Sequence, residues 1–534
     1  MEKSQRVGRQ DVQKVGDKDI MTEVIVGQRP VLVEIKPGQL FINGKWRDGE
    51  GGKNMPTINP ATEEVITTIA VASAKDVNDA INAANAAFPQ WAKLRGSERS
   101  KILHRVADLI EHYAHELGYR ETVDMGKLYK DVTSVDIPHI ANMFRYYAGW
   151  TTKVEGSVKP VEPVPGQNGN IMAITRREPL GVIAAITPFN FPLILSVSKI
   201  APALAAGNCI IHKPSSSTSL TSLLMAQIMA EAGVPEGVFN TVTGPGGSVG
   251  DLLIKSPGIE KIAFTGSTAV GRQLAKDAAD TFKHVTLELG GKSPNVIMAD
   301  ADIDEAVMNA YFGIFWNKGE VCVAGSRLLV QEGAFDEVVA KLKEKIAHTK
   351  TGDPLDPETD MGPLADDKEY AKVLKYIEIG KNEDHLQLVA GGNSLKVNGK
   401  GFFVEPTLFA PASNKTRVAQ EEIFGPVLPV IPFKTLDEAI EIANDSEYGL
   451  ASGIQTSDYR AAMRFANEVK AGTVWINTWH HYDPSAPFGG YKLSGYGREH
   501  GIESFEAYTQ HKTIWLDLDE PASKSHPVIR GPQA

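Results

Sequence analysis

One cysteine lies in a stretch that is suited to covalent catalysis. Cys322 stands at the centre of NKGEVCVAGSR, residues 317–327, among valine, alanine and glycine. Small neighbours on a turn-prone segment leave room for a substrate carbon to reach the sulfur, which a nucleophilic thiol requires. The alternative is a buried and inert thiol, since free cysteine is among the most buried residue types. The stretch by itself leaves both interpretations open.

Two more polar side chains follow strand-like apolar segments. Glu288, in VTLELGGKS, is expected to be buried, which raises the pKa of a carboxyl group toward the range of a general base. A helix cap or an ion pair with Lys292 is the alternative. Asn190, in ITPFNFP, is held between two prolines, where its amide could stabilise an oxyanion or form an ordinary Asx turn.

Two glycine-rich turns follow strand-like segments and precede helical ones. They are GPGGSVG, residues 244–250, and FTGSTAVG, residues 264–271. Glycine lets the backbone approach a pyrophosphate, and the amides of a helix N-terminus favour an anion. Neither turn is a GxGxxG or Walker sequence, because Arg272 stands where the Walker lysine would be. Two such turns in one α/β domain favour a bound dinucleotide.

These residues need a scaffold, and the chain predicts an α/β one. Apolar runs alternate with helical ones from Gly181 to about Glu288, and again from SPNVIMAD, residues 293–300, to about Ile476. Such alternation predicts two doubly wound, Rossmann-like domains that bind ligands at the carboxyl ends of their strands. LFINGKW, residues 40–46, predicts a hairpin, and helices are expected around 77–91 and 102–113, the second capped by Ser97.

The expected domain organisation follows from these shifts in pattern. Residues 28–156 and 180–290 would form the dinucleotide-binding domain and 291–495 the catalytic domain. Residues 157–179 and 500–520 are interpreted as strand-like oligomerisation arms, with FEAYTQHKTIWLDL, residues 505–518, as a strand. A polar leader, 1–27, and a tail, 521–534, are expected to be mobile.

Composition narrows the classes of function. The 534 residues carry a formal charge of -11, which argues against nucleic acid or an anionic membrane as a partner. With only two cysteines, Cys209 and Cys322, neither a disulfide framework nor a zinc cluster is expected, and no metal is predicted. No signal-peptide core or membrane-length apolar run is present, so a cytoplasmic location is expected.

Five motifs in order resemble the aldehyde dehydrogenase superfamily. They are FTGSTAVG, LELGGK, GEVCVAGSR, EEIFGP (421–426) and PFGGYKLSGYGRE (487–499), and the resemblance covers roughly residues 39–518. It implies a non-acylating, NAD(P)-dependent enzyme in which Cys322 is the nucleophile and Glu288 the base. Asn190 and the backbone amide of Cys322 would form the oxyanion hole. Lys199 and Glu499 match positions associated with a proton relay.

The resemblance also implies a set of residues that bind the cofactor. Gly266, Ser267 and Val270 would hold the pyrophosphate, Lys213 would reach the adenosine ribose, and Glu422 with Phe424 would position the nicotinamide ribose. The other expected contacts are Ile186, Thr187, Pro188, Phe189, Ser216, Gly246, Gly250, Phe264 and Leu289. Ser216 stands where NAD-preferring members often carry glutamate, and without that repelling carboxylate NADP should be tolerated beside NAD.

The expected reaction oxidises an aldehyde to a carboxylic acid. A Cys322 thiohemiacetal loses hydride to the cofactor, and water activated by Glu288 hydrolyses the resulting thioester. Members that transfer the acyl group to coenzyme A lack this glutamate. Glu320 replaces a glutamine of many members, a commonly tolerated variation.

The substrate is expected to be a hydrophobic or aromatic aldehyde. The resemblance places Phe191 and Tyr482 at the substrate funnel, near Tyr146, Tyr147, Ser198 and the loop 479–485, which lacks an arginine to clamp an anionic group. His480 and His481 could instead bind a polar tail. A cofactor-independent cysteine hydrolase or esterase is the alternative function. The arms imply a homodimer or homotetramer.

Overall fold

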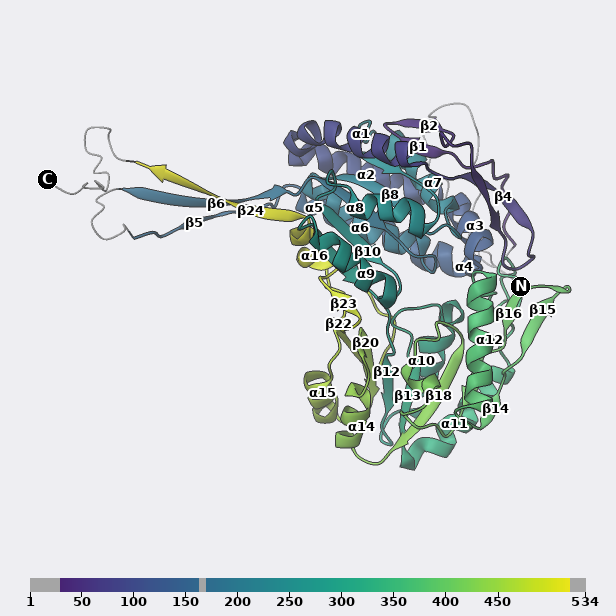
Figure 1. The fold of residues 1–534 in the computed structure, drawn as a ribbon. Helices are drawn as coiled ribbons and strands as arrows, with labels where there is room; N and C mark the ends of the chain where they lie inside the picture. Colours follow the sequence, from purple (N-terminus) through teal and green to yellow (C-terminus); the bar gives the residue numbers. More distant parts are fainter. Residues whose placement is uncertain (1–28, 163–169, 519–534) are drawn as a thin grey trace, which may run out of the picture.

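The computed structural model describes residues 29–162 and 170–518, which form two lobes and a projecting arm (Figure 1). The predicted leader, 1–27, and tail, 521–534, lie outside the described residues. Among the residues that are described, no helix is both long and apolar enough to cross a membrane.

The first lobe is built on an eight-stranded sheet in the order β2-β1-β9-β8-β7-β10-β11-β23. Its central strands, β9 to β11 in that order, run parallel, as the strand and helix alternation predicts. The bounds are β1 Leu40–Ile42, β2 Lys45–Arg47, β7 Val182–Ile186, β8 Cys209–Lys213, β9 Phe239–Thr241, β10 Lys261–Thr265, β11 His284–Glu288 and β23 Gly495–Tyr496.

Helices cover this sheet and bury one continuous apolar core with it. The larger ones are α1 Ala74–Lys93, α2 Gly96–His112, α3 Ala114–Met125, α5 Ile137–Trp150, α6 Pro192–Ala206, α7 Leu220–Glu231, α9 Thr268–Ala279 and α16 Gly501–Ala507. The shorter turns are α4 Tyr129–Asp131, η1 Val132–Asp136, η2 Gly246–Gly250 and α8 Asp251–Lys255. Cys209 is fully buried in this core, as its inert interpretation requires.

The second lobe contains a seven-stranded sheet in the order β14-β17-β18-β13-β12-β20-β21, parallel except for β14. Its strands are β12 Pro294–Ile297, β13 Arg327–Gln331, β14 Leu388–Ala390, β17 Thr407–Phe409, β18 Val427–Phe433, β20 Ala451–Gln455 and β21 Thr473–Ile476. Its helices are α10 Ile303–Phe315, η3 Trp316–Gly319, η4 Glu332–Ala334, α11 Phe335–Ala347, α12 Asp367–Asn382, α13 Arg417–Gln420, α14 Leu436–Asn444 and α15 Tyr459–Glu468. The predicted fold class, two doubly wound α/β domains, is confirmed.

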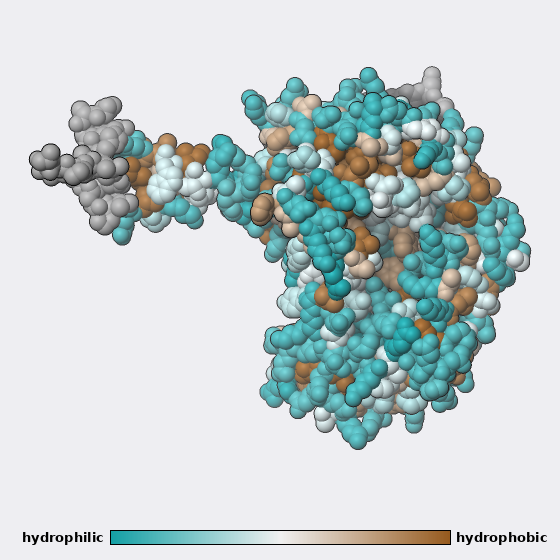
Figure 2. Space-filling view, viewed as in Figure 1, coloured by the Kyte–Doolittle hydropathy of each residue, from teal (hydrophilic) through white to brown (hydrophobic). Residues whose placement is uncertain are grey.

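The arm is a three-stranded antiparallel sheet that projects far from both lobes (Figure 1). It consists of β5 Ser157–Lys159, β6 Ile171–Pro179 and β24 Thr509–Asp517, and β24 pairs with β6 along its whole length. Apolar side chains are exposed on it, including Val158 and Trp515. Figure 2 shows brown, hydrophobic patches on the surface of the arm.

Three small antiparallel pairs complete the fold. They are β3 Asn54–Ile58 with β4 Val65–Ala70, β15 Ser394–Val397 with β16 Lys400–Val404, and β19 Tyr448–Gly449 with β22 Tyr491–Lys492. The hairpin of β1 and β2 is confirmed, since Asn43 and Gly44 both have positive φ, as its turn requires.

Three sequence predictions about elements are wrong. The cap of α2 is at Arg95, whose amide bonds to Glu98, so the predicted cap at Ser97 is two residues late. The strand predicted over 505–518 begins only at Thr509, because the preceding residues form α16. Phe505 and Tyr508 therefore pack in the first core and are not part of the arm expected over 500–520. Alternating apolar residues fit a short helix equally well.

Candidate active site

The carboxyl ends of three parallel strands bring the predicted catalytic groups to one edge. In the register of the first sheet, Ile186 of β7 lies beside Phe264 of β10, and Thr265 lies beside Glu288 of β11. Asn190 follows β7 directly, and Gly266 follows β10. Since ligands of doubly wound sheets bind at this edge, the positions agree with the sequence prediction.

The segment that carries Cys322 reaches this edge from the second lobe through an unusual turn. After α10, Asn317, Lys318 and Gly319 have consecutive left-handed φ values of 46°, 50° and 76°. A Cβ at Gly319 would collide with the carbonyl oxygen of Gly425, so glycine is needed there for space as well as for conformation. Cys322 follows, and its side chain is partly exposed.

The surroundings of Cys322 keep the thiol protonated. Loss of hydration on burial and the nearby carboxylates of Glu288 and Glu422 raise the pKa of Cys322 to about 12. A thiol is a poor nucleophile in this form, because attack requires the thiolate. The site therefore needs a group that accepts the thiol proton as the sulfur attacks.

Glu288 has the properties of such a proton acceptor. Its carboxyl group is almost completely buried at the end of β11, and neither oxygen has a hydrogen-bond partner in the described structure. Burial, followed by the nearby Glu499 carboxylate, raises the pKa of Glu288 well above its usual value, although Lys199 and Arg498 oppose the shift. A buried carboxyl group with free oxygens fits the predicted base and not a helix cap or an ion pair with Lys292.

Asn190 is tied directly to the segment that carries Cys322. Its side-chain Nδ2 donates to the backbone oxygen of Glu320 at 2.9 Å, and its own backbone oxygen accepts from Asn317 Nδ2 at 3.0 Å. An asparagine amide has two N–H donors, so one is left for an oxyanion beside the sulfur. Asn190 thus holds the segment that carries Cys322 in place, and its second N–H is available to stabilise an oxyanion.

Lys199 and Glu499, the predicted relay residues, form a buried ion pair. Lys199 Nζ also donates to Thr265 Oγ1 at 2.6 Å, and Ser198 Oγ donates to Glu499 Oε2 at 2.7 Å. Sequence reasoning missed Thr265 and placed Ser198 at the mouth of the funnel. Ser198 is instead buried in this network, on the same helix as Lys199.

The predicted pyrophosphate residues lie at the turn between β10 and α9, and a second glycine-rich turn, residues 244–250, follows β9. Ser267 is the N-cap of α9 and accepts from the amide of Val270, and both residues are exposed. A Cβ at Gly246 would meet nothing within 4 Å, so space for a ligand is open over the second turn. An exposed helix N-terminus beside an open glycine turn fits a pyrophosphate.

At two positions of the turn 264–271, close packing requires glycine, which the sequence did not indicate. A Cβ at Gly271 would collide with the side chain of Leu289, which lets α9 lie close to the end of β11. A Cβ at Gly266 would meet the ring of Phe264 in the same way. The other predicted contacts follow β7: Ile186 and Thr187 are buried, and Pro188 and Phe189 are partly exposed.

Lys213 and Ser216 follow β8, the neighbouring strand. Lys213 is buried, its Nζ donates to the oxygen of Pro214 at 2.8 Å, and burial lowers its pKa to about 8. Its stem passes Gly250, where a Cβ would lie 3.9 Å from Lys213 Cδ. Ser216, three residues after Lys213, is partly exposed.

Glu422 and Phe424 bring the second lobe to the same place. Glu422 Oε1 accepts from the amide of Gly291 at 3.0 Å, next to the segment that bears Cys322. Phe424, with a left-handed φ of 60°, meets the ring of Phe189 edge-on at 5.8 Å. Residues of both lobes that are predicted to bind the cofactor, Phe189 and Phe424, are therefore in contact.

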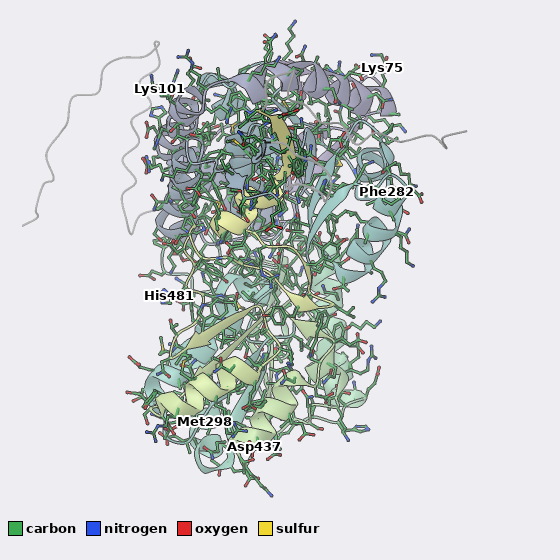
Figure 3. The ribbon with its side chains drawn as sticks, turned by 90° about the vertical axis from the view of Figure 1, so that its left-hand side faces the viewer. Lys75, Lys101, Phe282, Met298, Asp437 and His481 are labelled. Atoms are coloured by element: carbon green, nitrogen blue, oxygen red, sulfur yellow. The ribbon has the colours of Figure 1, made fainter. Side chains whose placement is uncertain are left out.

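Aromatic side chains pack in the apolar cluster that also contains Cys322. Phe191 packs on Trp316 with ring centres 5.3 Å apart, and Tyr482 contacts Trp475 and lies within electrostatic reach of the thiol. His481 lies at the waist between the lobes (Figure 3). Tyr147, predicted at the mouth of the funnel, is instead fully buried, and its hydroxyl donates to the oxygen of Gly501.

Sequence reasoning also missed a group of buried charges beneath these aromatic rings. Lys127 and Asp136 form an ion pair at 2.6 Å with both side chains fully buried, and Lys127 Nζ lies 4.1 Å above the ring of Phe191. Lys318 and Glu320 form a second pair beside Cys322. No metal-binding group of three or more His, Cys, Asp or Glu residues occurs within residues 29–162 and 170–518.

Comparison with known proteins gives a consistent result. A sequence model described as "Aldehyde dehydrogenase family" matches residues 46–514. Aldehyde dehydrogenase family 2 member C4 of Arabidopsis thaliana is 44% identical over 490 residues, which cover 91% of this chain and 96% of the relative. Retinal dehydrogenase 2 of Homo sapiens is 42% identical over 495 residues, which cover 92% of this chain and 94% of that protein.

Solved structures agree with the sequence relatives. The NAD+ complex of an aldehyde dehydrogenase from Bacillus cereus is 42% identical, with a TM-score of 0.88, over 90% of this chain and 97% of that one. An indole-3-acetaldehyde dehydrogenase from P. syringae, in complex with NAD+ and IAA, is 40% identical, with a TM-score of 0.87, over 90% and 97% of the two chains.

Proposed function

Because the chain belongs to the aldehyde dehydrogenase family, we propose that it oxidises a hydrophobic or aromatic aldehyde to the carboxylic acid through Cys322 and Glu288. Membership of the family shows that the chain is an NAD(P)-dependent aldehyde dehydrogenase that forms an acid. The roles proposed for Cys322 and Glu288 rest on one observation. The buried carboxyl group of Glu288 has no hydrogen-bond partner in the described structure and lies close to the protonated thiol of Cys322.

In the proposed reaction, Glu288 takes the proton of Cys322 as the sulfur forms a bond to the aldehyde carbon. The carbonyl electron pair moves to oxygen, where the second N–H of Asn190 and the amide of Cys322 donate to the oxyanion. When bound, NAD(P) accepts the hydride that leaves this carbon. Glu288 gives up the thiol proton to solvent and then removes a proton from the water that attacks the thioester. The C–S bond breaks, the acid leaves, and the Cys322 sulfur takes this second proton back from Glu288.

The residues at both turns fit a dinucleotide cofactor. Ser267 and Val270 are exposed at the N-terminus of α9, Gly246 leaves open space, and Glu422 with Phe424 lies beside the nucleophile. We propose that Gly266, Ser267 and Val270 hold the pyrophosphate, Lys213 the adenosine ribose and Glu422 the nicotinamide ribose.

We propose that NADP is accepted as well as NAD. Ser216 is a neutral residue after β8 and does not repel a 2'-phosphate as a carboxylate would. Initial rates with each cofactor test this, and Ser216→Glu should lower kcat/KM for NADP by at least tenfold while that for NAD changes little. Complete inactivity of the wild type with NADP would contradict the proposal.

The hydrophobic or aromatic character of the substrate rests on the rings near Cys322. Phe191, Trp316 and Tyr482 offer apolar surface, and the cation that lies over Phe191, Lys127, is fully buried and already paired with Asp136. Relatives named for retinal and indole-3-acetaldehyde support this class. We expect a higher kcat/KM for benzaldehyde or a long aliphatic aldehyde than for succinate semialdehyde, and the opposite order would contradict the proposal.

The experiment that tests the function follows reduced nicotinamide by absorbance with a panel of aldehydes. The wild type should produce it, and Cys322→Ala should not, although it should still bind the cofactor. Full activity in the variant would show that the mechanism is wrong. Cleavage of esters without hydride transfer or cofactor binding would support a cysteine hydrolase instead.

We propose that the arm joins subunits into a homodimer or homotetramer. Its sheet projects from the body and exposes Val158 and Trp515, and such an edge needs a partner. The division into a cofactor-binding domain, 28–156 and 180–290, and a catalytic domain, 291–495, with arms at 157–179 and 500–520, is proposed likewise, with 501–508 reassigned to the first lobe. We also propose a cytoplasmic location, although two relatives are named as mitochondrial.

A further inference from the structure

The turn before Cys322 carries two charged side chains that are buried instead of solvated. Lys318 is 1% exposed and Glu320 is 0% exposed, and Lys318 Nζ lies 3.4 Å from Glu320 Oε2. Lysine and glutamate are almost never fully buried unless they are paired. This pair stands only two and four residues from the nucleophile.

Lys318 connects the turn to the first lobe. Its Nζ donates to the backbone oxygen of Met125 at 2.7 Å, the last residue of α3, and lies 3.5 Å from the sulfur of Met125. The carbonyl groups at the C-terminus of a helix attract a cation. The ammonium therefore holds the turn against α3, nearly 200 residues away in the sequence.

Glu320 connects the same turn to the second lobe and to the active site. Its Oε1 accepts from the amide of Ala365 at 3.0 Å, just before α12. Its backbone oxygen accepts from the side chain of Asn190 at 2.9 Å. One residue thus touches both the second lobe and the group assigned to the oxyanion hole.

The backbone of the turn requires such anchors. Asn317 and Lys318 both adopt left-handed φ values without being glycine, a conformation that residues with a side chain rarely adopt. A strained conformation of this kind persists only where the surrounding contacts enforce it. The contacts of Lys318 and Glu320 lie on two lobes and enclose the turn.

We propose that Lys318 and Glu320 form a charge-balanced clamp that positions Cys322 for attack. The clamp serves the reaction proposed above and rests on that function. Both residues are positioning residues, because neither is placed against the reacting atoms. Each charge depends on the other, since burial lowers the pKa of Lys318 and raises that of Glu320. The clamp should therefore tolerate the loss of both charges better than the loss of one.

Three variants test the charge balance: Glu320→Gln, Lys318→Gln and the double variant. Glu320→Gln keeps an acceptor for Ala365 but leaves the Lys318 ammonium without a counter-charge. We expect each single variant to lower the first-turnover rate of reduced nicotinamide at least tenfold, with the dissociation constant of NAD+ within twofold of wild type. The double variant should recover to within threefold of wild type. A surface control, Lys341→Gln, removes an exposed ion pair and should change nothing.

Alkylation provides a second measurement that does not depend on dehydrogenase activity. In the single variants, Cys322 should leave the field of Glu288 and Glu422 and react at least threefold faster with iodoacetamide, as measured by peptide mass spectrometry. Cys209, fully buried in the first core, should stay unmodified and so exclude unfolding as the cause. If the wild type forms no reduced nicotinamide with any aldehyde, the proposed function fails, and the alkylation rates still test the clamp.

The contradicting results are equally specific. Wild-type turnover and alkylation in Glu320→Gln would show that the clamp does not position Cys322. A double variant as slow as the worse single variant would show that charge balance is unimportant. If the single variants are insoluble, a soluble double variant with near wild-type rates supports the pairing, and an insoluble or inactive double variant contradicts it.

Discussion

At the residue scale, Glu288 and Cys322 are both affected by burial and by nearby carboxylates. Burial raises the pKa of both Glu288 and Cys322, because each ionised form loses its hydration and lies near other carboxylates. The site therefore disfavours ionisation of either group. This arrangement makes the reaction sensitive to the protonation of Glu288.

The pH dependence of thioester hydrolysis should report on Glu288. A base acts in its deprotonated form, so a pKa raised above its usual value moves the acidic limb of the rate profile to higher pH. We expect the hydrolysis rate to rise with pH and to reach half of its maximum well above the ordinary pKa of a glutamate. Rapid-quench measurement of acid release at each pH gives this profile.

The matched control is Glu288→Gln, which should lower the hydrolysis rate by about 100-fold or more and remove the limb. An acidic limb that persists unchanged in the variant would assign the titration to another group.

The sequence indicates a role for a residue most clearly where a reactive side chain stands at a position typical of functional sites. Cys322, Glu288 and Asn190 follow apolar strands or lie in small-residue turns, so their types alone suggested roles. Lys318 and Glu320 were missed as a pair because a charged residue is normally expected in solvent. Their partners, Met125 and Ala365, are distant in the sequence, and no local pattern indicates such contacts.

At the element scale, the left-handed turn from Asn317 to Gly319 is the least ordinary part of the site. It takes the chain from the end of α10 to the nucleophile. The side chain of Asn317 donates to the oxygen of Asn190, and the oxygen of Asn317 accepts from the amide of Glu320. Regular helix could not continue here without moving Cys322 away from the strand ends of the first lobe. The turn therefore sets the position of the thiol.

Gly319→Ala tests how strongly the turn depends on glycine. The variant places a Cβ against the oxygen of Gly425 at a positive φ, and we expect it to lower both unfolding free energy and activity. Gly399→Ala is the matched control, because Gly399 also has a positive φ but open space around it. Denaturant unfolding should show Gly319→Ala to be less stable than the control by at least about 1 kcal/mol.

If the two alanine variants are equally stable, the close approach of Gly425 has no energetic consequence, and the φ angle alone explains the glycine.

Elements with strong periodicity were predictable, and element boundaries were less so. The parallel strands and glycine turns of the first lobe follow from apolar runs bounded by turn residues. The helix α16 was read as part of a strand because Phe505 and Tyr508 also fit an alternating pattern. Both side chains are buried in the apolar core of the first lobe, and this tertiary packing stabilises the helix instead of a strand.

At the scale of the whole molecule, the two lobes contribute complementary parts of one site. The first supplies Asn190, Glu288 and the glycine turns, and the second supplies Cys322 and Glu422. The lobes are joined through buried contacts such as Lys318 with Met125, so the geometry of the site depends on how they pack. The arm takes no part in this packing (Figure 1).

The arm should instead control assembly. We expect Trp515→Glu, which places a charge among the exposed apolar residues of β24, to lower the solution mass measured by light scattering. His511→Ser changes an exposed residue of the same strand and should leave the mass as in the wild type. A wild type that is already monomeric would show that the arm has another role.

The most direct test of the account is to identify the covalent intermediate. Glu288→Gln is mixed with an aromatic aldehyde and NAD+, quenched in acid and digested, and the peptides are weighed by mass spectrometry. We predict one acyl group on Cys322, formed together with one reduced nicotinamide per subunit more slowly than in the wild type, because the thiol has lost its proton acceptor, and hydrolysed more slowly still. Reduced nicotinamide and free acid formed at the wild-type rate without this adduct, or an acyl group on a different residue, would contradict the assigned roles of Cys322 and Glu288.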